Sequence, residues 1–421
     1  MTIKAIRGFN DILPPETNRW RLIEDRARET FQAFGYAEVR LPILERTEVF
    51  TRSIGEETDI VEKEMYTFED RNGDLLTLRP EATASIARAY IEHKMYASEP
   101  VAQLYCIGPM FRYERPQKGR SRQFHQINVE VFGVSHPMMD AEVMAMLMHY
   151  LFSLGIKGCD LQINSLGCPS CRVHYKEDLQ TFLRGHIAQL CPDCQRRMEI
   201  NPLRAFDCKI PGCQDVTSQA PLMDRYLCRD CADHFAAVKS HLESLNVAYT
   251  VNPRMVRGLD YYTRTTFEAL AEGLGAQNAV AAGGRYDDLI EALGGPSTPG
   301  IGFAIGMERL LLLLAEESSR HGPSVFVAAL GTAAQKKAFE LSYRLKQAGV
   351  TTLFDYHDRS LKAQMRRANK FSASYVLILG EEELQRGKAI FRDMKEKRQE
   401  EIPLTSAFRE IVNRVSGRTS R

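Results

Sequence analysis

"FRYERPQKGRSRQFHQINVEVFG", residues 111–133, indicates both the fold of this 421-residue chain and the kind of ligand it holds. From residue 123 onward the side chains alternate as they do in a strand, and "VAQLYCIGPMFRYE", residues 101–114, has the character of a second strand. We therefore expect a long antiparallel hairpin with a basic connection. Against one acid, Glu114, that connection carries Arg112, Arg115, Lys118, Arg120 and Arg122. Such a local excess of positive charge predicts contact with a polyanion.

The later strand of this hairpin is expected to have one apolar and one polar face. Period-two spacing puts Ile127, Val129 and Val131 on one side and Phe124, Gln126, Asn128 and Glu130 on the other. The polar row fits either the solvated face of an ordinary sheet or the wall of a pocket. An acid at Glu130 between two valines, with Gln126 four residues earlier, favours the pocket.

Length and composition limit the class of protein. A chain of this size predicts about two or three domains, each with its own core. The 55 basic and 54 acidic residues nearly cancel, so any affinity for a polyanion has to come from local patches. No window reaches the roughly 18 uninterrupted apolar residues of a membrane helix, and the N-terminal residues lack the apolar core of a secretion signal. We expect a cytoplasmic protein without membrane association.

The pattern of elements differs between the two ends of the chain. Apolar spacing predicts a helix over 18–34, a hairpin over 66–78 around the turn Asn72-Gly73, and a helix over 79–93. Strand character returns over 248–270, and the glycine-rich stretches 279–295 and 300–317 each lead into a helix. Beyond a linker at 317–324, strands and helices alternate, which is typical of a small parallel α/β domain.

Most of the cysteines gather in one segment. Of ten in the chain, eight form close pairs, and these are Cys168/Cys171, Cys191/Cys194, Cys208/Cys213 and Cys228/Cys231. Pairs at this spacing can supply two four-cysteine zinc sites of the closed, structural type. Free structural thiols, a redox pair and an iron–sulfur cluster are the alternatives. Which pairs share an ion cannot be predicted, because loop-closure entropy varies slowly with length.

Taken together, these features resemble the histidyl-tRNA synthetase family over nearly the whole chain. The matching motifs, in order, are "RGFNDILPPE" at 7–16, "RPEATASIARAY" at 79–90, "FRYERPQKGRSRQFHQ" at 111–126, "RGLDYYTRTTFE" at 257–268, "GGRYDDLI" at 283–290 and "GIGFAIGMERL" at 300–310. The resemblance implies an α+β catalytic domain on an antiparallel sheet, of the class II synthetase type. That domain would comprise residues 1–166 and 244–320. A cysteine-rich, mainly helical insertion would comprise residues 167–243, and an α/β anticodon-binding domain would comprise residues 323–421.

The resemblance also implies an activity and its partners. The chain would activate L-histidine with ATP to histidyl-adenylate and pyrophosphate, and then transfer histidine to the 3′ end of tRNA(His), usually as a homodimer. Arg112 and Arg257 would be the catalytic cations on the α-phosphate and the carboxylate, with Mg²⁺ bridging phosphates. ATP would be bound by Arg112, Glu114, Phe124 and Arg309. Histidine would be bound by Glu81, Thr83, Gln126, Glu130, Arg257, Tyr261 and Tyr262, with Glu130 and Tyr262 on the imidazole.

Two groups of basic residues are expected to contact RNA. Near the acceptor stem these are Arg115, Lys118, Arg120 and Arg122, and in the C-terminal domain Arg359, Lys362, Arg366, Arg367 and Lys370. A solvated basic face is the alternative for the second group. Two other functions compete with the enzyme: a histidine-sensing regulatory subunit and a zinc-stabilised RNA-binding protein. The first tends to lack the Arg257 motif and the C-terminal domain, and the second does not need the histidine-binding set.

Overall fold

The computed structural model describes residues 2–55, 58–274, 278–314 and 324–419. The chain divides into two compact units, Met1–Ala315 and Glu316–Arg421. Almost all of the predicted linker 317–324, and the predicted domain limits at 320 and 323, lie outside the described residues. Among the described residues, no helix has the length and apolar character needed to cross a membrane.

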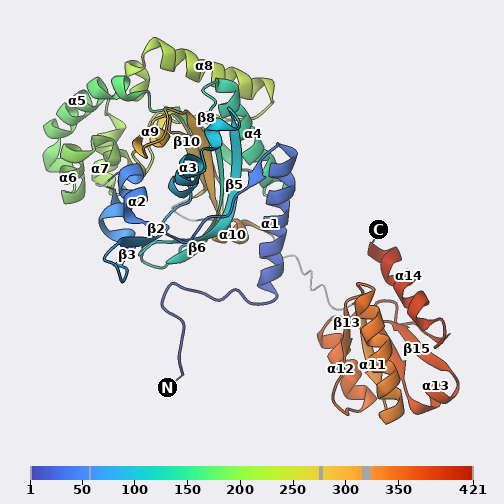
Figure 1. Ribbon diagram of the computed structural model, residues 1–421. Coiled ribbons are helices and arrows are strands. Elements are labelled where there is room, and N and C mark those ends of the chain that lie inside the picture. The colour runs from blue at the N-terminus through green and yellow to red at the C-terminus, as the bar shows by residue number, and fades with distance from the viewer. Residues whose placement is uncertain (1, 56–57, 275–277, 315–323, 420–421) are drawn as a thin grey trace. The chain divides into compact units, whose positions relative to one another are not determined.

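An eight-stranded sheet forms the centre of the first unit (Figure 1). The predicted hairpin is present as β5 (Ala102–Phe111) and β6 (Gln123–Phe132), which pair antiparallel over their whole length. Next to β6 lie β11 (Gly300–Gly306), β10 (Ala279–Arg285), β9 (Thr263–Leu270) and β7 (Asp160–Ser165), all antiparallel. Only the short edge strands β1 (Ala37–Glu38) and β8 (Thr250–Val251) pair parallel among the described residues of this sheet. The prediction of an antiparallel catalytic sheet is confirmed.

Helices cover the apolar face of this sheet. The face carries Ile127, Val129 and Val131, as predicted, and all three are fully buried. Each such side chain contributes about 1.5 to 3 kcal/mol by leaving water. The covering helices are α1 (Glu16–Ala33), α4 (Pro137–Ser153), α8 (Arg229–Ser244) and α10 (Met307–Leu313), which share one core with the strands.

Smaller elements flank the polar face of the sheet. They are α2 (Thr47–Ile54), the π-helical turn η1 (Ile60–Glu64), α3 (Thr83–Glu92), η2 (Met95–Ala97) and α9 (Leu289–Ala292). A three-stranded sheet, in the order β2 (Leu44–Arg46), β4 (Leu75–Leu78) and β3 (Tyr66–Glu69), contains the predicted hairpin. Its turn includes Gly73 at a φ of 86°, a conformation that glycine adopts without strain.

The cysteine-rich insertion is mainly helical, as expected. It contains α5 (Pro169–Gly185), α6 (Pro192–Ile200), α7 (Pro211–Ser218) and the short 3₁₀ helices η3 (Ile187–Gln189), η4 (Pro202–Asp207) and η5 (Met223–Tyr226). Proline stands at the first position of each of the three α-helices, where its missing N–H costs no hydrogen bond. Helix α8 begins at the last cysteine pair and packs along α4. It therefore joins the insertion to the main core.

The second unit is a five-stranded sheet with helices. Strands β13 (Thr352–Phe354), β12 (Val325–Ala329) and β14 (Tyr375–Leu379) pair parallel, as predicted, and alternate with α11 (Thr332–Gln347) and α12 (Leu361–Lys370). The sheet then continues antiparallel with β15 (Lys388–Asp393) and β16 (Gln399–Pro403), between α13 (Glu381–Gln385) and α14 (Ala407–Thr419). The expectation of a purely parallel sheet was therefore incomplete.

Candidate active site and cysteine clusters

A cavity of about 680 Å³ lies over the polar face of the large sheet. Its walls come from β6, β9, β10 and β11, from the start of α3, from the loop before β9 and from the insertion. Nearly all of the predicted substrate residues line it, although they are far apart in the sequence. They are Glu81, Thr83, Arg112, Glu114, Phe124, Gln126, Arg257, Tyr261, Tyr262 and Arg309.

The remaining predicted residue, Glu130, is buried beneath the cavity and is not part of its lining. One carboxylate oxygen accepts a hydrogen bond of 2.6 Å from Thr83 Oγ1, and the other accepts one from the hydroxyl of Tyr286. Burial raises the pKa of Glu130 well above its usual value, although both hydrogen bonds oppose the shift. Gly302 on the next strand leaves room for this carboxylate, because a Cβ there would lie 2.0 Å from Glu130 Oε2.

Three tyrosines gather around this acid. Tyr261 and Tyr262 have ring centroids 4.7 Å apart, and Tyr286 lies 5.5 Å from Tyr261. Burial raises the pKa of all three, so their hydroxyls remain protonated donors at neutral pH. Tyr286 was missed by sequence reasoning, although it lies in the quoted motif at 283–290. Its partner is 156 residues away, and no local pattern indicates such a contact.

Glu81 holds the start of α3 at the cavity wall. Its carboxylate accepts hydrogen bonds of 2.8 Å from the backbone N–H groups of Thr83 and Ala84. Burial raises the pKa of Glu81, and the N–H donors oppose that shift. A carboxylate has about four acceptor positions, so Glu81 can receive a further donor from a ligand. Beside it, Gln126 Oε1 is buried without a hydrogen-bond partner among the described residues.

Arginines line another part of the cavity. Arg257 is partly buried, with 15% of its side chain exposed, and forms an ion pair with Glu268. Its guanidinium carbon lies 5.5 Å from the ring centroid of Tyr262. Burial lowers the pKa of Arg257, but Glu268 and Tyr262 outweigh this and the pKa rises. Arg112 donates from Nε to the Pro80 carbonyl at 2.9 Å, and its guanidinium carbon is 5.3 Å from the centroid of Phe124.

Glu114 and Arg309 complete this cationic region. Glu114 accepts a hydrogen bond of 2.9 Å from Arg120 and lies 4.0 Å from Arg112. Arg309 Nη1 donates to the Ala279 carbonyl at 2.5 Å. Burial lowers the pKa of Arg309, and repulsion from Arg120 and Arg112 adds to the effect. Arginine guanidinium groups gathered in this way form a site suited to phosphate oxygens, which they bind in pairs.

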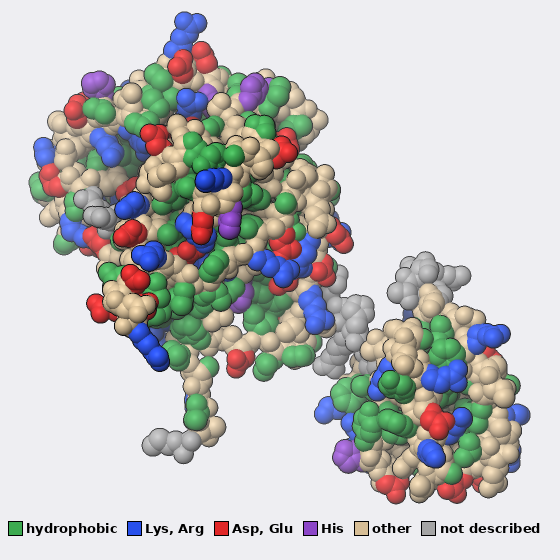
Figure 2. Space-filling model, viewed as in Figure 1, with side chains coloured by type: hydrophobic (Ala, Val, Ile, Leu, Met, Phe, Trp, Pro, Cys, Tyr) green, Lys and Arg blue, Asp and Glu red, His purple; other side chains and the backbone are tan. Residues whose placement is uncertain are grey.

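The predicted RNA-contact residues have different surroundings. In the loop after β5, Arg115 and Lys118 are exposed, whereas the Arg122 guanidinium lies 3.8 Å from the ring centroid of Tyr113. In the second unit Arg367 forms an ion pair of 2.6 Å with the buried Asp355. The rest of that group, Arg359, Lys362, Arg366 and Lys370, is exposed. On the face seen in Figure 2, basic and acidic side chains are interspersed, as the near-zero net charge indicates.

The eight paired cysteines form two clusters. The first cluster is Cys168, Cys171, Cys228 and Cys231, and the second cluster is Cys191, Cys194, Cys208 and Cys213. Within each, the Sγ atoms all lie within 4.8 Å of one another, and all ten cysteines of the chain are free thiols. A tetrahedral zinc site with bonds of about 2.3 Å separates its sulfurs by about 3.8 Å. The Sγ distances of 3.5 Å for Cys168–Cys171 and 3.9 Å for Cys191–Cys208 fit such a site.

Backbone N–H groups also point at these sulfurs. The N–H of Cys228 donates to Cys171 Sγ at 3.1 Å, and the N–H of Cys191 donates to Cys213 Sγ at 3.2 Å. These donors stabilise thiolates, which are the form that binds a metal. The geometry answers the question of pairing that the sequence leaves open. The first cluster joins the two ends of the insertion, and the second lies within it.

Comparisons with known proteins agree with this geometry. The family model described as "Histidyl-tRNA synthetase" matches residues 8–170 and 197–310, and the model described as "Anticodon binding domain" matches residues 324–414. A curated "Histidine--tRNA ligase" of Syntrophotalea carbinolica is 55% identical over 99% of this chain and 100% of its own length. The "Histidine--tRNA ligase" of Geobacter sulfurreducens is 55% identical over 98% of this chain and 100% of its own length.

A solved structure supports the same assignment. The apo histidyl-tRNA synthetase of S. aureus is 36% identical, has a TM-score of 0.83, and is matched over 98% of this chain and 100% of its own. The full-length relatives above and a family model covering most of the first unit point to the same family. The chain belongs to the histidyl-tRNA synthetase family.

Proposed function

We propose that the cavity of the first unit is the place where this chain, a histidine–tRNA ligase, joins histidine to ATP and then to tRNA(His). One observation carries the proposal. A buried acid with hydroxyl donors, Glu130, lies at the base of a cavity whose remaining walls carry Arg112, Arg257 and Arg309. A carboxylate can accept a hydrogen bond from an imidazole N–H, and arginine guanidinium groups can bind the oxygens of a triphosphate.

The first step forms the mixed anhydride. A carboxylate oxygen of histidine attacks the α-phosphorus of ATP, the bond to the bridging oxygen breaks, and pyrophosphate leaves. Negative charge increases on the phosphate oxygens during this displacement, so preorganised cations lower the barrier. We assign Arg112 and Arg257 to the α-phosphate and the carboxylate, and Arg309 to the γ-phosphate. Loss of one such cation is expected to cost about 3 to 4 kcal/mol of transition-state stabilisation, as does loss of an oxyanion donor.

The nucleotide and the metal complete this step. Adenine can stack on the ring of Phe124, and Glu114 can accept a hydrogen bond from the exocyclic amine of adenine. Mg²⁺, when bound, would supply further positive charge against the phosphates, beside Arg112, Arg257 and Arg309. The second step then transfers the acyl group: a hydroxyl of the terminal ribose of tRNA, by family resemblance the 3′-hydroxyl, attacks the carbonyl carbon, and AMP leaves.

Selection of histidine rests on the tyrosine-rich end of the cavity. Glu130 would accept a hydrogen bond from one imidazole nitrogen of histidine, and Tyr262 would contact the other nitrogen. Glu81, Thr83 and the unpaired Gln126 Oε1 would bind the α-ammonium, with Tyr261 beside them. A site that hydrogen-bonds its substrate in this way rejects analogues without the group by about 10⁴ to 10⁵. Binding alone can therefore supply the specificity.

Each cysteine cluster is proposed to bind one structural zinc ion. Four thiolates fill a tetrahedral zinc shell and leave no open position for substrate, so the ions would stabilise the fold of the insertion and would take no part in the reaction.

The second unit is proposed to bind the anticodon region of tRNA(His), as its family model implies. We also propose a homodimer, from family membership alone, and multi-angle light scattering tests it.

Exchange of labelled pyrophosphate into ATP, measured with each amino acid in turn, tests the enzyme assignment. Only the first step is needed for this exchange, so tRNA is left out. We expect exchange with histidine and with no other amino acid. Absence of exchange with every amino acid would overturn the assignment.

A further inference from the structure

The second cysteine cluster encloses a segment of the insertion between its ligands. Cys194 lies in the first turn of α6 and Cys208 follows η4 directly, so residues 195–207 run from one ligand pair to the other. Helix α6 has nine residues, which is too short to be stable alone in water. The position of this segment therefore depends on the cluster and on the small core built around it.

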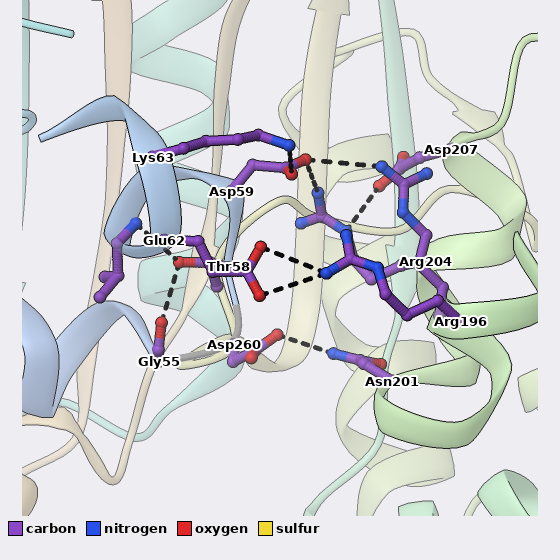
Figure 3. A network of polar contacts seen from close by, with 12 residues as sticks. Gly55, Thr58, Asp59, Glu62, Lys63, Arg196, Asn201, Arg204, Asp207 and Asp260 are labelled. Carbon is purple, nitrogen blue, oxygen red and sulfur yellow. Dashed lines mark hydrogen bonds and ion pairs between the residues drawn. The ribbon is translucent and has the colours of Figure 1, made fainter. Parts of the chain in front are cut away.

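This enclosed segment makes several polar contacts that connect the insertion to loops bordering the cavity (Figure 3). Helix α5 of the insertion adds a hydrogen bond of 3.0 Å from Arg172 to the Tyr262 carbonyl. One partner of the enclosed segment is η1 together with the residue before it, through Glu62 and Asp59. The other is the loop before β9, through Asp260. The contacts are Arg196–Glu62 at 3.4 Å, Arg197–Asp59 at 3.5 Å, Arg204–Asp59 at 3.6 Å and Asn201 Nδ2 to Asp260 Oδ1 at 2.8 Å.

The side chain of Arg204 is less exposed than that of Arg196 in the same segment. Only 16% of its side chain is exposed, against 48% for Arg196, and it lines the substrate cavity. It pairs with Asp207 at 3.4 Å, and its Nη1 lies 3.4 Å from the position that a Cβ on Gly258 would take. Gly258 directly follows Arg257, so this guanidinium packs against the backbone of the catalytic loop.

Asp207 connects this contact to the catalytic cation. It lines the same cavity as Arg257 and lies 3.4 Å from Arg204. Arg204 and Asp207, both supplied by the insertion, thus form one side of the pocket in which Arg257 has to be held.

We propose that the metal ion of the second cluster fixes Arg204 against the loop of Arg257 and Tyr262, and that Arg204 is thereby a positioning residue for histidine activation. The inference rests on the proposed function of the cavity. If the insertion served only to bind tRNA, histidine activation would not need it. The proposal instead requires the insertion for histidine activation, a step in which tRNA takes no part. Misplacement of a catalytic group by about 1 Å can lower a rate about 100-fold, so a remote support of this kind can have a large effect.

Arg204→Gln in the full-length chain is the first test. We expect metal content equal to wild type and a fall of about 10- to 100-fold in kcat/KM for histidine in pyrophosphate exchange, with partial recovery in Arg204→Lys. Arg184→Gln is the matched control, because Arg184 forms an exposed ion pair of 2.6 Å with Glu199 in the same insertion. Exchange at the wild-type rate in Arg204→Gln would overturn the proposal.

Cys208→Ser is the second test, with Cys159→Ser as a control outside both clusters. Elemental mass spectrometry of the variant should find one metal ion fewer per chain than in wild type, and exchange should fall as in Arg204→Gln. Loss of tRNA charging with normal exchange, or wild-type protein without bound metal, would overturn the proposal. If Cys208→Ser does not fold, Arg204→Gln decides alone. Absence of exchange in wild type would instead refute the proposed function.

Discussion

Glu130 illustrates how a single residue depends on its surroundings. It is a fully buried acid, and Thr83 and Tyr286 direct hydroxyl groups at its two oxygens, which lowers the cost of burying this polar group. The sequence predicted the acid from its place in a strand, because alternation is a local pattern. The tyrosine could not be predicted in the same way, because its contact with Glu130 depends on how β6 and the end of β10 lie across the sheet.

Tyr286→Phe tests this arrangement. The substitution removes one donor to a charged acceptor, which is worth about 1.5 to 3 kcal/mol, so KM for histidine should rise about 10- to 100-fold. KM for ATP should change little, because Tyr286 lies at the proposed histidine-binding end of the cavity. Pyrophosphate exchange at varied histidine and at varied ATP gives both constants. Tyr249→Phe is the control, since its hydroxyl donates to Glu243 at the surface; equal KM values in the two variants would contradict the account.

Glu130→Gln tests the raised pKa. The folded protein keeps the Glu130 proton at pH values where the unfolded chain has lost it, so this residue costs stability as pH rises from about 4.3 through its folded pKa. The variant lacks this cost. The unfolding free energy of the variant should therefore increase relative to that of wild type as pH rises over this range. Trp20, the single tryptophan, is buried in the first unit and reports unfolding by fluorescence. A pH-independent difference between the two proteins would refute the assignment.

At the scale of elements, a buried ionic network joins three parts of the first unit. Arg285 at the end of β10 pairs with Asp140 of α4 at 2.7 Å, and the other carboxylate oxygen of Asp140 lies 2.9 Å from His234 Nε2 of α8. Burial raises the pKa of Asp140, but His234 and Arg285 outweigh it and the pKa falls. The network attaches the last helix of the insertion to the sheet, directly beside Tyr286.

Asp140→Asn is expected to lower the unfolding free energy by at most about 3 to 5 kcal/mol, because the buried Arg285 loses one ionic partner and keeps Asp287 at 3.0 Å. Denaturant titration followed by Trp20 fluorescence measures the change. Arg40→Ala serves as the control, because the Arg40–Glu38 pair is at the surface, with 84% of the Arg40 side chain exposed, and should cost less than about 1 kcal/mol. Equal destabilisation in both variants would argue against a structural role for the network.

Elements were predictable where their side chains repeat with a period. The β5–β6 hairpin, the turn at Asn72-Gly73 and the three parallel strands of the second unit follow from such patterns. Strands β15 and β16 were missed because five of their eleven residues are charged, and only Ala389, Phe391 and Ile402 of their described residues are buried. The cysteine pairing required the fold itself, because the cost of closing each loop is similar for every possible pairing.

At the scale of the whole molecule, the two units divide the proposed work between histidine activation and tRNA binding. The second unit has its own core and an exposed basic group on and before α12. Its Arg367 is engaged with Asp355 and is better explained as a structural residue. The exposed members of the group remain predicted phosphate contacts.

Replacement of Lys362, Arg366 and Lys370 by glutamine tests that prediction. For every phosphate that these side chains neutralise, the substitution should reduce the slope of log affinity for tRNA against log salt concentration by about 0.7 to 0.9. Pyrophosphate exchange should not change, because no tRNA takes part. Filter binding of tRNA at several salt concentrations measures the slope. A slope equal to that of wild type would mean that these side chains form only a solvated surface.

A crystal structure of the chain with histidine and a non-hydrolysable ATP analogue tests the central claim most directly. We expect the imidazole within hydrogen-bonding distance of Glu130 and Tyr262, and the α-phosphate between Arg112 and Arg257. Histidine bound outside this cavity, or an imidazole turned away from Glu130, would contradict the account.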